Sequence, residues 1–213
     1  MRTQPGSIVE TEDDPTPIVL ILAATLRRSE RTPKLAELMR KAKGTVALRS
    51  TVDPQAATIR FTGGRVRVER GIAPDADVVI ATDVNRMADE HPPKAKVTGA
   101  ATHPRLALAV AKLLEPPTGT WQDEARTFWA KVAASGTGPN GLRIVCTDRP
   151  AELTFGTTPA EFEIHGTDHR LQAMLSGNTV FGQEVFDGHL HSVGTLRHLA
   201  ELTGVSIDLM MGR

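Results

Sequence analysis

The sequence has few aromatic residues, one cysteine and no excess charge of either sign. Of its 213 residues, six are Phe, two are Trp and none is Tyr, which argues against base stacking on aromatic side chains. The 25 Lys and Arg residues balance 25 Asp and Glu residues, whereas a nucleic-acid-binding protein carries a basic surplus. From the balanced charge and the few aromatic residues we expect no nucleic-acid partner. A single cysteine cannot form an internal disulfide bond, so we expect a reducing compartment, the cytoplasm.

The chain also lacks a long hydrophobic segment. Its apolar run at residues 18–24 is far shorter than the roughly 20 residues that span a bilayer. The run follows acidic residues and precedes Arg27 and Arg28, which is the reverse of a signal peptide. We therefore expect a buried helix or strand there, and we predict that the polar, proline-rich residues 1–17 form a flexible tail.

Two segments of the chain share a pattern of turns and apolar residues. When residues 58–89 are placed over residues 143–174, several positions are identical: Ile59 and Ile144, Thr62 and Thr147, Gly71 and Gly156, Pro74 and Pro159, Thr82 and Thr167, Asp83 and Asp168, Ala88 and Ala173. Such self-similarity indicates an internal repeat. It predicts two units, over residues 18–115 and 116–213.

Each segment begins with a predicted β-hairpin. The first turns at Gly63 and Gly64, because paired glycines tolerate the positive φ angles of a two-residue turn. That turn places Phe61 opposite Val66, Ile59 opposite Val68 and Arg60 opposite Arg67. The second turns at Asp148 and Arg149, and it places Ile144 opposite Leu153 and Cys146 opposite Ala151. Apolar pairs on one face are what cross-strand packing requires.

The remaining elements follow in the same order in both units. Third strands are predicted over 76–81 and 161–166, helices from the capping residues Asp83 and Asp168, short strands over 95–98 and 183–190, and C-terminal helices over 104–114 and 193–203. Further helices beginning at Thr32 and Thr120 precede each unit. The predicted fold class is α+β: two units, each an antiparallel sheet covered by helices on one face.

This order resembles the sterol carrier protein 2 (SCP2) family of lipid-binding domains. The resemblance is strongest over residues 166–177 and 186–194, and weaker in the first unit, which has residues 89–93 in place of the Leu-Ser-Gly close and looks like a degenerate copy. It implies a tunnel in the second unit that binds or transfers a sterol, fatty acid or acyl-CoA-type lipid without catalysis or a cofactor. The candidate apolar lining residues are Leu171, Met174, Leu175, Val180, Phe181, Val185, Phe186, Leu190, Leu209 and Met210.

Two other functions stay open. One is an interaction or scaffold protein, in which the same apolar side chains fill a core. The other is a metal-dependent enzyme, because His189 and His191 are spaced to share a strand face and chelate a metal, with His165, His169 or His198 as a third ligand.

Three further predictions concern an arginine strip, a partner enzyme and the single cysteine. The alternating residues Arg60, Arg65, Arg67 and Arg70 would suit an anionic membrane surface or a solvated sheet face. Because SCP2-like units also occur beside larger enzymes, a partner enzyme is a further possibility. Cys146 is predicted to be a buried hydrophobe rather than a nucleophile.

Overall fold

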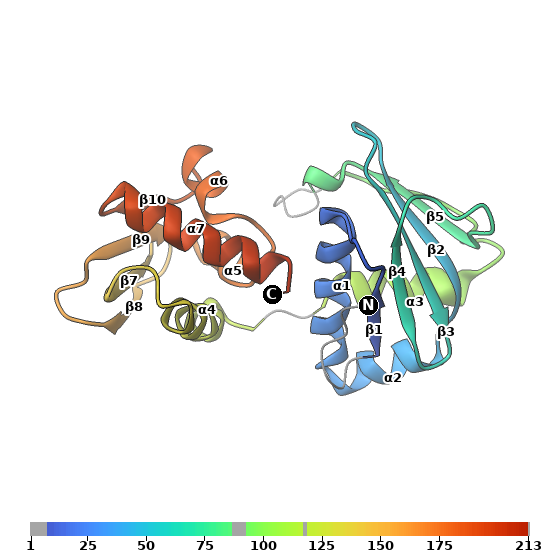
Figure 1. The fold of residues 1–213 in the computed structure, drawn as a ribbon, viewed down its shortest axis with the longest axis horizontal. Helices are drawn as coiled ribbons and strands as arrows, with labels where there is room; N and C mark the ends of the chain where they lie inside the picture. Colours follow the sequence, from blue (N-terminus) through green and yellow to red (C-terminus); the bar gives the residue numbers. More distant parts are fainter. Residues whose placement is uncertain (1–7, 87–92, 117–118, 213) are drawn as a thin grey trace. The chain divides into compact units, whose positions relative to one another are not determined.

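The chain folds into two compact units of α+β type, Met1–Pro117 and Thr118–Met211 (Figure 1). The computed structural model describes residues 8–86, 93–116 and 119–212. Each unit has its own apolar core, as an independently packed domain requires. The predicted α+β class is confirmed.

The first unit contains a six-stranded sheet in the order β1-β4-β3-β2-β5-β6. Its strands are β1 (Val9–Thr11), β2 (Lys43–Ser50), β3 (Ala56–Thr62), β4 (Val66–Arg70), β5 (Val78–Thr82) and β6 (Lys96–Thr98). Its helices are α1 (Pro17–Glu30), α2 (Pro33–Lys41) and α3 (Pro104–Leu114). The apolar sides of the helices pack with Val46, Ile59 and Val68 of the sheet in one core cluster.

The β3–β4 hairpin has the predicted register. Phe61 lies opposite Val66, Ile59 opposite Val68 and Arg60 opposite Arg67. Gly63 and Gly64 adopt φ angles of 73° and 128°, which only glycine accepts without strain. A local turn signal was therefore sufficient to fix this pairing.

The N-terminal segment is not a tail over its described part, so that prediction was wrong. Residues 9–11 form β1, which pairs in parallel with β4, and Val9 is completely buried. The Ile8 N–H donates to Glu30 Oε1 at 3.0 Å, and α1 already begins at Pro17. Val9 and Thr11 are buried on either side of the less buried Glu10, but the acidic composition around them concealed this alternation in the sequence. Residues 1–7 lie outside the described residues.

The helix predicted from Asp83 is present only as a short 3-10 turn, η1 (Val84–Arg86). Asp83 caps it as expected, because its Oδ1 accepts from the Asn85 N–H at 3.1 Å. Ala88 and residues 89–92, which entered the repeat and the family comparison, lie outside the described residues.

The second unit contains a four-stranded sheet in the order β10-β9-β7-β8. Its strands are β7 (Gly141–Cys146), β8 (Ala151–Gly156), β9 (Phe162–Gly166) and β10 (His191–Val193). Its helices are α4 (Trp121–Ser135), α5 (Asp168–Leu175), α6 (Phe181–Phe186) and α7 (Leu196–Met210). The hairpin register is confirmed, with Ile144 opposite Leu153 and Cys146 opposite Ala151.

The C-terminal elements differ from the prediction. The expected strand over 183–190 is instead helix α6 followed by a turn, because Phe181 and Val185 meet the core with helical spacing. Helix α7 begins three residues later than expected, at Leu196, where the Thr195 hydroxyl accepts from the His198 N–H at 3.2 Å. It continues to Met210, so Leu209 and Met210 belong to its last turn.

Both sheets are mixed, so the prediction that each sheet is antiparallel was wrong. β5 pairs in parallel with β2, and β9 pairs in parallel with β7. The two parallel pairs begin with matching bonds: the Asp77 N–H donates to Thr45 O and the Glu161 N–H to Gly141 O, both at 2.9 Å. By this topology β7 corresponds to β2, and β8 corresponds to β3.

The predicted repeat therefore aligned the wrong hairpin of the first unit. It placed β3 and β4 over β7 and β8, whereas the shared topology places β2 and β3 there. Successive hairpins of a meander look alike in sequence, because turn signals and alternation recur with each strand. One consequence is that β4 has no counterpart among the described strands of the second unit, where β8 is the edge.

Candidate apolar site

The second unit encloses one apolar cluster between a face of its sheet and its helices. The sheet contributes Leu142, Ile144, Phe162 and Ile164, which alternate along β7 and β9 with residues of the opposite face. The helices contribute Trp121 and Phe128 from α4 and Leu202 and Val205 from α7. A surface of this composition can hold only an apolar group, because a polar one would lose its hydrogen bonds to water.

Most of the predicted lining residues lie in this cluster. Leu171, Met174, Leu175 and Phe181 are completely buried, and Leu190 is nearly so. Val185 and Leu209 are half-buried against the same cluster. Val180 and Met210 are half-buried as well.

Phe186 does not belong to the lining, and its prediction was wrong. Its side chain is 92% exposed. Phe181 and Phe186 are five residues apart on α6, so they point to different sides of the helix. The prediction assumed a strand, in which the buried face is chosen by alternation rather than by helical periodicity.

Helix α6 covers the apolar cluster as part of a short segment, residues 177–188, which we call the α6 flap. The flap begins and ends at Gly177 and Gly188, both with φ of 74°. Its Phe181 side chain packs edge-on against Phe162, with ring centroids 6.1 Å apart. The Phe181 N–H donates to the buried Ser206 Oγ at 3.0 Å, which ties the start of α6 to α7.

A buried carboxylate beneath the flap was missed by the sequence analysis. Glu184 on α6 has only 6% of its side chain exposed, and its Oε2 lies 3.6 Å from Arg170 Nη1 and 3.4 Å from His189 Nδ1. The Glu184 C=O also accepts from the N–H groups of His189 and Leu190. A buried carboxylate needs charged or hydrogen-bonding partners, and here the Arg170 and His189 side chains are nearest to it. No pattern in the sequence signalled that α5 and α6 would bring them together.

The histidines are not arranged as a metal site in the described part of the chain. His191 starts β10, whereas His189 lies in the preceding turn beside Glu184, so the two do not share a strand face. His165 pairs with His191 across the strands and lies 2.9 Å from Glu163 Oε2 through its Nε2. His198 is 4.0 Å from Glu161 and His169 is exposed. Among residues 8–86, 93–116 and 119–212, no cluster of three or more His, Cys, Asp or Glu side chains is suited to hold a metal.

Asp148, in the hairpin turn, acts as the acceptor at the start of α5. Its Oδ1 accepts from the Asp168 N–H at 2.9 Å and from the Cys146 thiol at 3.0 Å. Asp168 itself makes an ion pair with Arg149 at 2.9 Å rather than capping the helix, which corrects the predicted role. Burial, and then the bond to Asp148, raises the pKa of the Cys146 thiol, so a buried, unreactive cysteine fits the structure.

We expect acid to release this connection. The bonds from the Cys146 thiol and the Asp168 N–H lower the pKa of Asp148 below 3.8. A lowered native pKa adds stability that is present above pH 3.8 and is lost as the pH falls through the native value. In Asp148→Asn the side-chain oxygen still accepts but no longer titrates, so the contribution of Asp148 to the pH dependence of the Asp168 amide shift should disappear from an NMR titration. An unchanged titration curve in this variant would contradict the assignment.

Three of the four arginines of the predicted basic strip are paired with carboxylates. Arg60 makes two bonds to Asp75, at 3.0 and 3.2 Å, and Arg67 lies 2.7 Å from Glu69. Arg70 pairs with Glu12 at 3.2 Å. These pairs support the reading of a solvated sheet face rather than a site for anionic headgroups.

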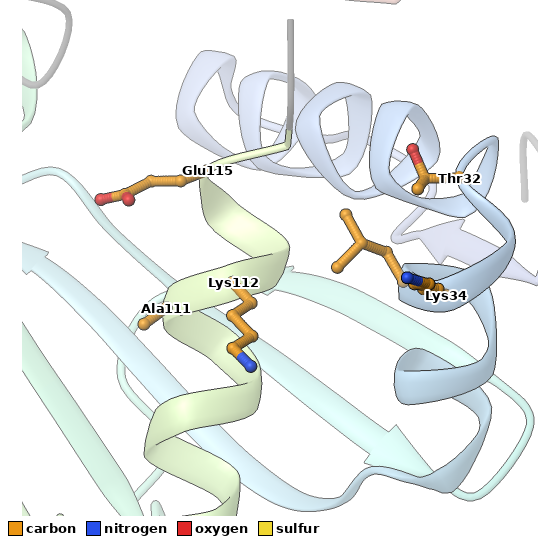
Figure 2. Close-up of a pocket in the computed structure, with 6 residues that line it drawn as sticks. Thr32, Lys34, Ala111, Lys112 and Glu115 are labelled. Carbon is orange, nitrogen blue, oxygen red and sulfur yellow. The ribbon is translucent and has the colours of Figure 1, made fainter.

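A shallow groove lies elsewhere, between α2 and α3 of the first unit. It has a volume of about 410 Å³ and is lined by Thr32, Lys34, Leu35, Ala111, Lys112 and Glu115. Figure 2 shows Thr32 just before α2, Lys34 on α2, and Lys112 and Glu115 at the α3 side. Its two lysines and its glutamate are exposed. None of these residues was a predicted ligand contact.

Comparisons with known proteins give only distant structural likenesses. No family model matches the chain, and no curated protein matches it. Within the described residues, no helix is both long and apolar enough to cross a bilayer.

Two solved structures carry names from the family that the sequence resembles. The ubiquinone synthesis protein UbiJ-SCP2 is 18% identical, with a TM-score of 0.34 over 50% of this chain and 100% of its own. A conserved protein from Thermus thermophilus, described as a candidate sterol carrier protein, is 12% identical, with a TM-score of 0.19 over 89% of this chain and 85% of its own. At these TM-scores neither likeness supports a statement about function.

Proposed function

We propose that this protein binds an apolar ligand of lipid type in the second unit, between the sheet and helices α5, α6 and α7. The observation that carries the proposal is the α6 flap, a short segment bounded by two glycines that closes over a cluster of apolar side chains. Binding sites for small molecules are mostly apolar, with few polar groups. Affinity would come from the apolar area that the ligand and the cluster remove from water.

Entry of the ligand requires the flap to move, because the lining residues are closed to solvent. We expect the movement to hinge at Gly177 and Gly188, because glycine tolerates large changes of its backbone angles. Polar contacts hold the flap at both ends: the Asn178 and Thr179 N–H groups donate to Ala173 O, the Phe181 N–H donates to Ser206, and Glu184 makes ion pairs. The apolar contacts of Phe181 would be exchanged for contacts with the ligand.

The proposed activity is binding or transfer without chemistry on the ligand. The Cys146 thiol has a raised pKa and is buried, so it is a poor nucleophile. Of the polar groups that approach the cluster, Ser206 accepts from the Phe181 N–H, and the Glu184 carboxylate makes ion pairs with Arg170 and His189. The sequence-based expectation of a cytoplasmic location stays a prediction.

Two leucines of α7 provide a matched test. Leu209 is half-buried against the apolar cluster, whereas Leu196 is 83% exposed. We expect Leu209→Gln to weaken the binding of a fluorescent long-chain fatty acid by about tenfold, because roughly 1.5 kcal/mol of apolar contact is lost. Leu196→Gln should leave the affinity unchanged.

The measurement is a fluorescence titration of both variants and the unaltered chain. Equal weakening by both substitutions would indicate nonspecific surface binding and would contradict the site. A chain that is folded but takes up no fatty acid or sterol would contradict the function itself and would favour the interaction-protein alternative. That alternative is consistent with the complete burial of four predicted lining residues: Leu171, Met174, Leu175 and Phe181.

A further inference from the structure

Strand β8 forms one edge of the second sheet, whereas the corresponding strand of the first unit lies inside its sheet. In the first unit the strand that corresponds to β8 is β3, which pairs with β4, and β4 in turn pairs with β1. In the second unit β8 pairs with β7 alone among the described strands. An edge of this kind presents unpaired backbone N–H and C=O groups to a further strand.

The hydrogen bonds to β7 identify which groups of β8 point outward. The Thr157 N–H donates to Asn140 O at 2.8 Å, and the register continues through Leu142 opposite Phe155 and Ile144 opposite Leu153. Bonded pairs alternate along an antiparallel ladder, so Leu153 and Phe155 bond inward to β7. The N–H and C=O groups of Glu152 and Thr154 therefore point away from the sheet.

The side chains of β8 also lack the usual protection of an edge. Ala151, Leu153 and Phe155 are half-buried on the core face, while Glu152 is the only charged residue in the strand. Phe155 stacks on Trp129 of α4, with ring centroids 5.7 Å apart, and Trp129 is itself half-buried. Natural edges are usually short, charged or interrupted by proline, and β8 contains no proline.

We propose that β8 is a dimerisation edge, which pairs in antiparallel fashion with β8 of a second copy of this chain. The strand is complementary to itself about Leu153. In that register Leu153 faces Leu153 of the partner subunit, Ala151 faces Phe155 of the partner subunit, and Glu152 faces Thr154 of the partner subunit. The apolar residues stay on one face, and the two glutamates do not face each other.

This arrangement joins two four-stranded sheets into one continuous sheet with twofold symmetry. Each interface then uses the same surface of both copies, as a closed dimer requires. Backbone hydrogen bonds of Glu152 and Thr154 would supply the pairing, and the apolar row would supply the burial. The inference rests on the edge position and the self-complementarity of β8 rather than on a ligand, although Leu153 and Phe155 pack against the same apolar cluster.

Thr154→Pro tests the proposal, because it removes an outward N–H without removing a bond to β7. Proline is tolerated at such edge positions when the N–H faces away from the sheet. The control is Thr154→Val, which retains the N–H and the shape of the side chain. Sedimentation equilibrium of the full chain should give twice the mass of 22.9 kDa for the unaltered chain and for Thr154→Val, and the monomer mass for Thr154→Pro.

Hydrogen exchange of the unaltered chain gives a second readout that needs no substitution. In the dimer the amides of Glu152 and Thr154 should exchange slowly, and they should become fast on dilution to the monomer. A chain that stays monomeric over the concentration series would overturn the proposal. So would a dimer in which these two amides exchange fast, or one that Thr154→Pro leaves intact.

Discussion

Phe181→Ala is expected to destabilise the second unit by about 3–5 kcal/mol, whereas Phe186→Ala should change its stability by less than about 0.5 kcal/mol. The two residues are the ends of the same short helix, but Phe181 is completely buried and Phe186 is 92% exposed. Truncation of Phe181 leaves a cavity beside Phe162, against which its ring packs edge-on. The Phe186 ring lies in solvent, so its truncation leaves no cavity in the core.

Tryptophan fluorescence measures this difference in one unit alone. Both tryptophans of the chain, Trp121 and Trp129, lie on α4 of the second unit, so urea unfolding followed by fluorescence reports that unit. Equal midpoints for the two variants would show that α6 does not cover the core, and the account of the flap would then be wrong.

Ser206→Ala is expected to loosen the α6 flap without changing its apolar surface. The Ser206 hydroxyl accepts from the Phe181 N–H at 3.0 Å and donates to Thr203 O at 2.8 Å, and it is completely buried. Loss of the acceptor leaves a buried N–H without a partner, which costs about 1–3 kcal/mol. If the flap gates entry, the dissociation rate of a bound fluorescent fatty acid should rise by roughly tenfold or more.

Stopped-flow displacement of the fatty acid measures that rate. Ser192→Ala, in the edge strand β10, is the control and should leave the rate unaltered. A Ser206→Ala chain that is less stable but releases ligand at the original rate would separate the flap from ligand exchange and would contradict its role as a gate.

Local signals predicted the hairpins and several helices correctly. The Gly63-Gly64 turn determined the β3–β4 register, and Pro104 marked the start of α3 to the residue. In the second unit Thr120 begins α4 as expected, with its hydroxyl accepting from the Asp123 N–H. Turn and capping signals depend on residues close in sequence, so they can be recognised without knowledge of the tertiary structure.

The features that depend on distant residues were missed. The parallel pairing of β9 with β7, and the joining of β1 to β4, bring together segments whose own sequences carry no mark of a partner. The strand predicted over 183–190 became a helix because tertiary burial of Phe181 decided its conformation. The buried Glu184 arises for the same reason, since its partners Arg170 and His189 come from elements placed by the fold.

The apolar site was predicted mainly as a set of hydrophobic residues. Leu171, Met174, Leu175 and Phe181 lie in one cluster as expected, because apolar periodicity reports burial. Sequence periodicity does not distinguish a filled core from a cavity, since both need the same residue types. The α6 flap, through which we expect the ligand to enter, could not be predicted, because the sequence suggested a strand where the structure has helix α6.

Photochemical crosslinking tests the central claim most directly. A long-chain fatty acid that carries a photoreactive group near its terminal methyl is bound to the full chain, irradiated and mapped by peptide mass spectrometry. The account predicts one fatty acid per chain, attached to residues 171–190 or 205–211. Attachment at 32–35 and 111–115 would place the ligand in the α2–α3 groove instead, and a folded chain with no saturable attachment would contradict the binding of an apolar ligand.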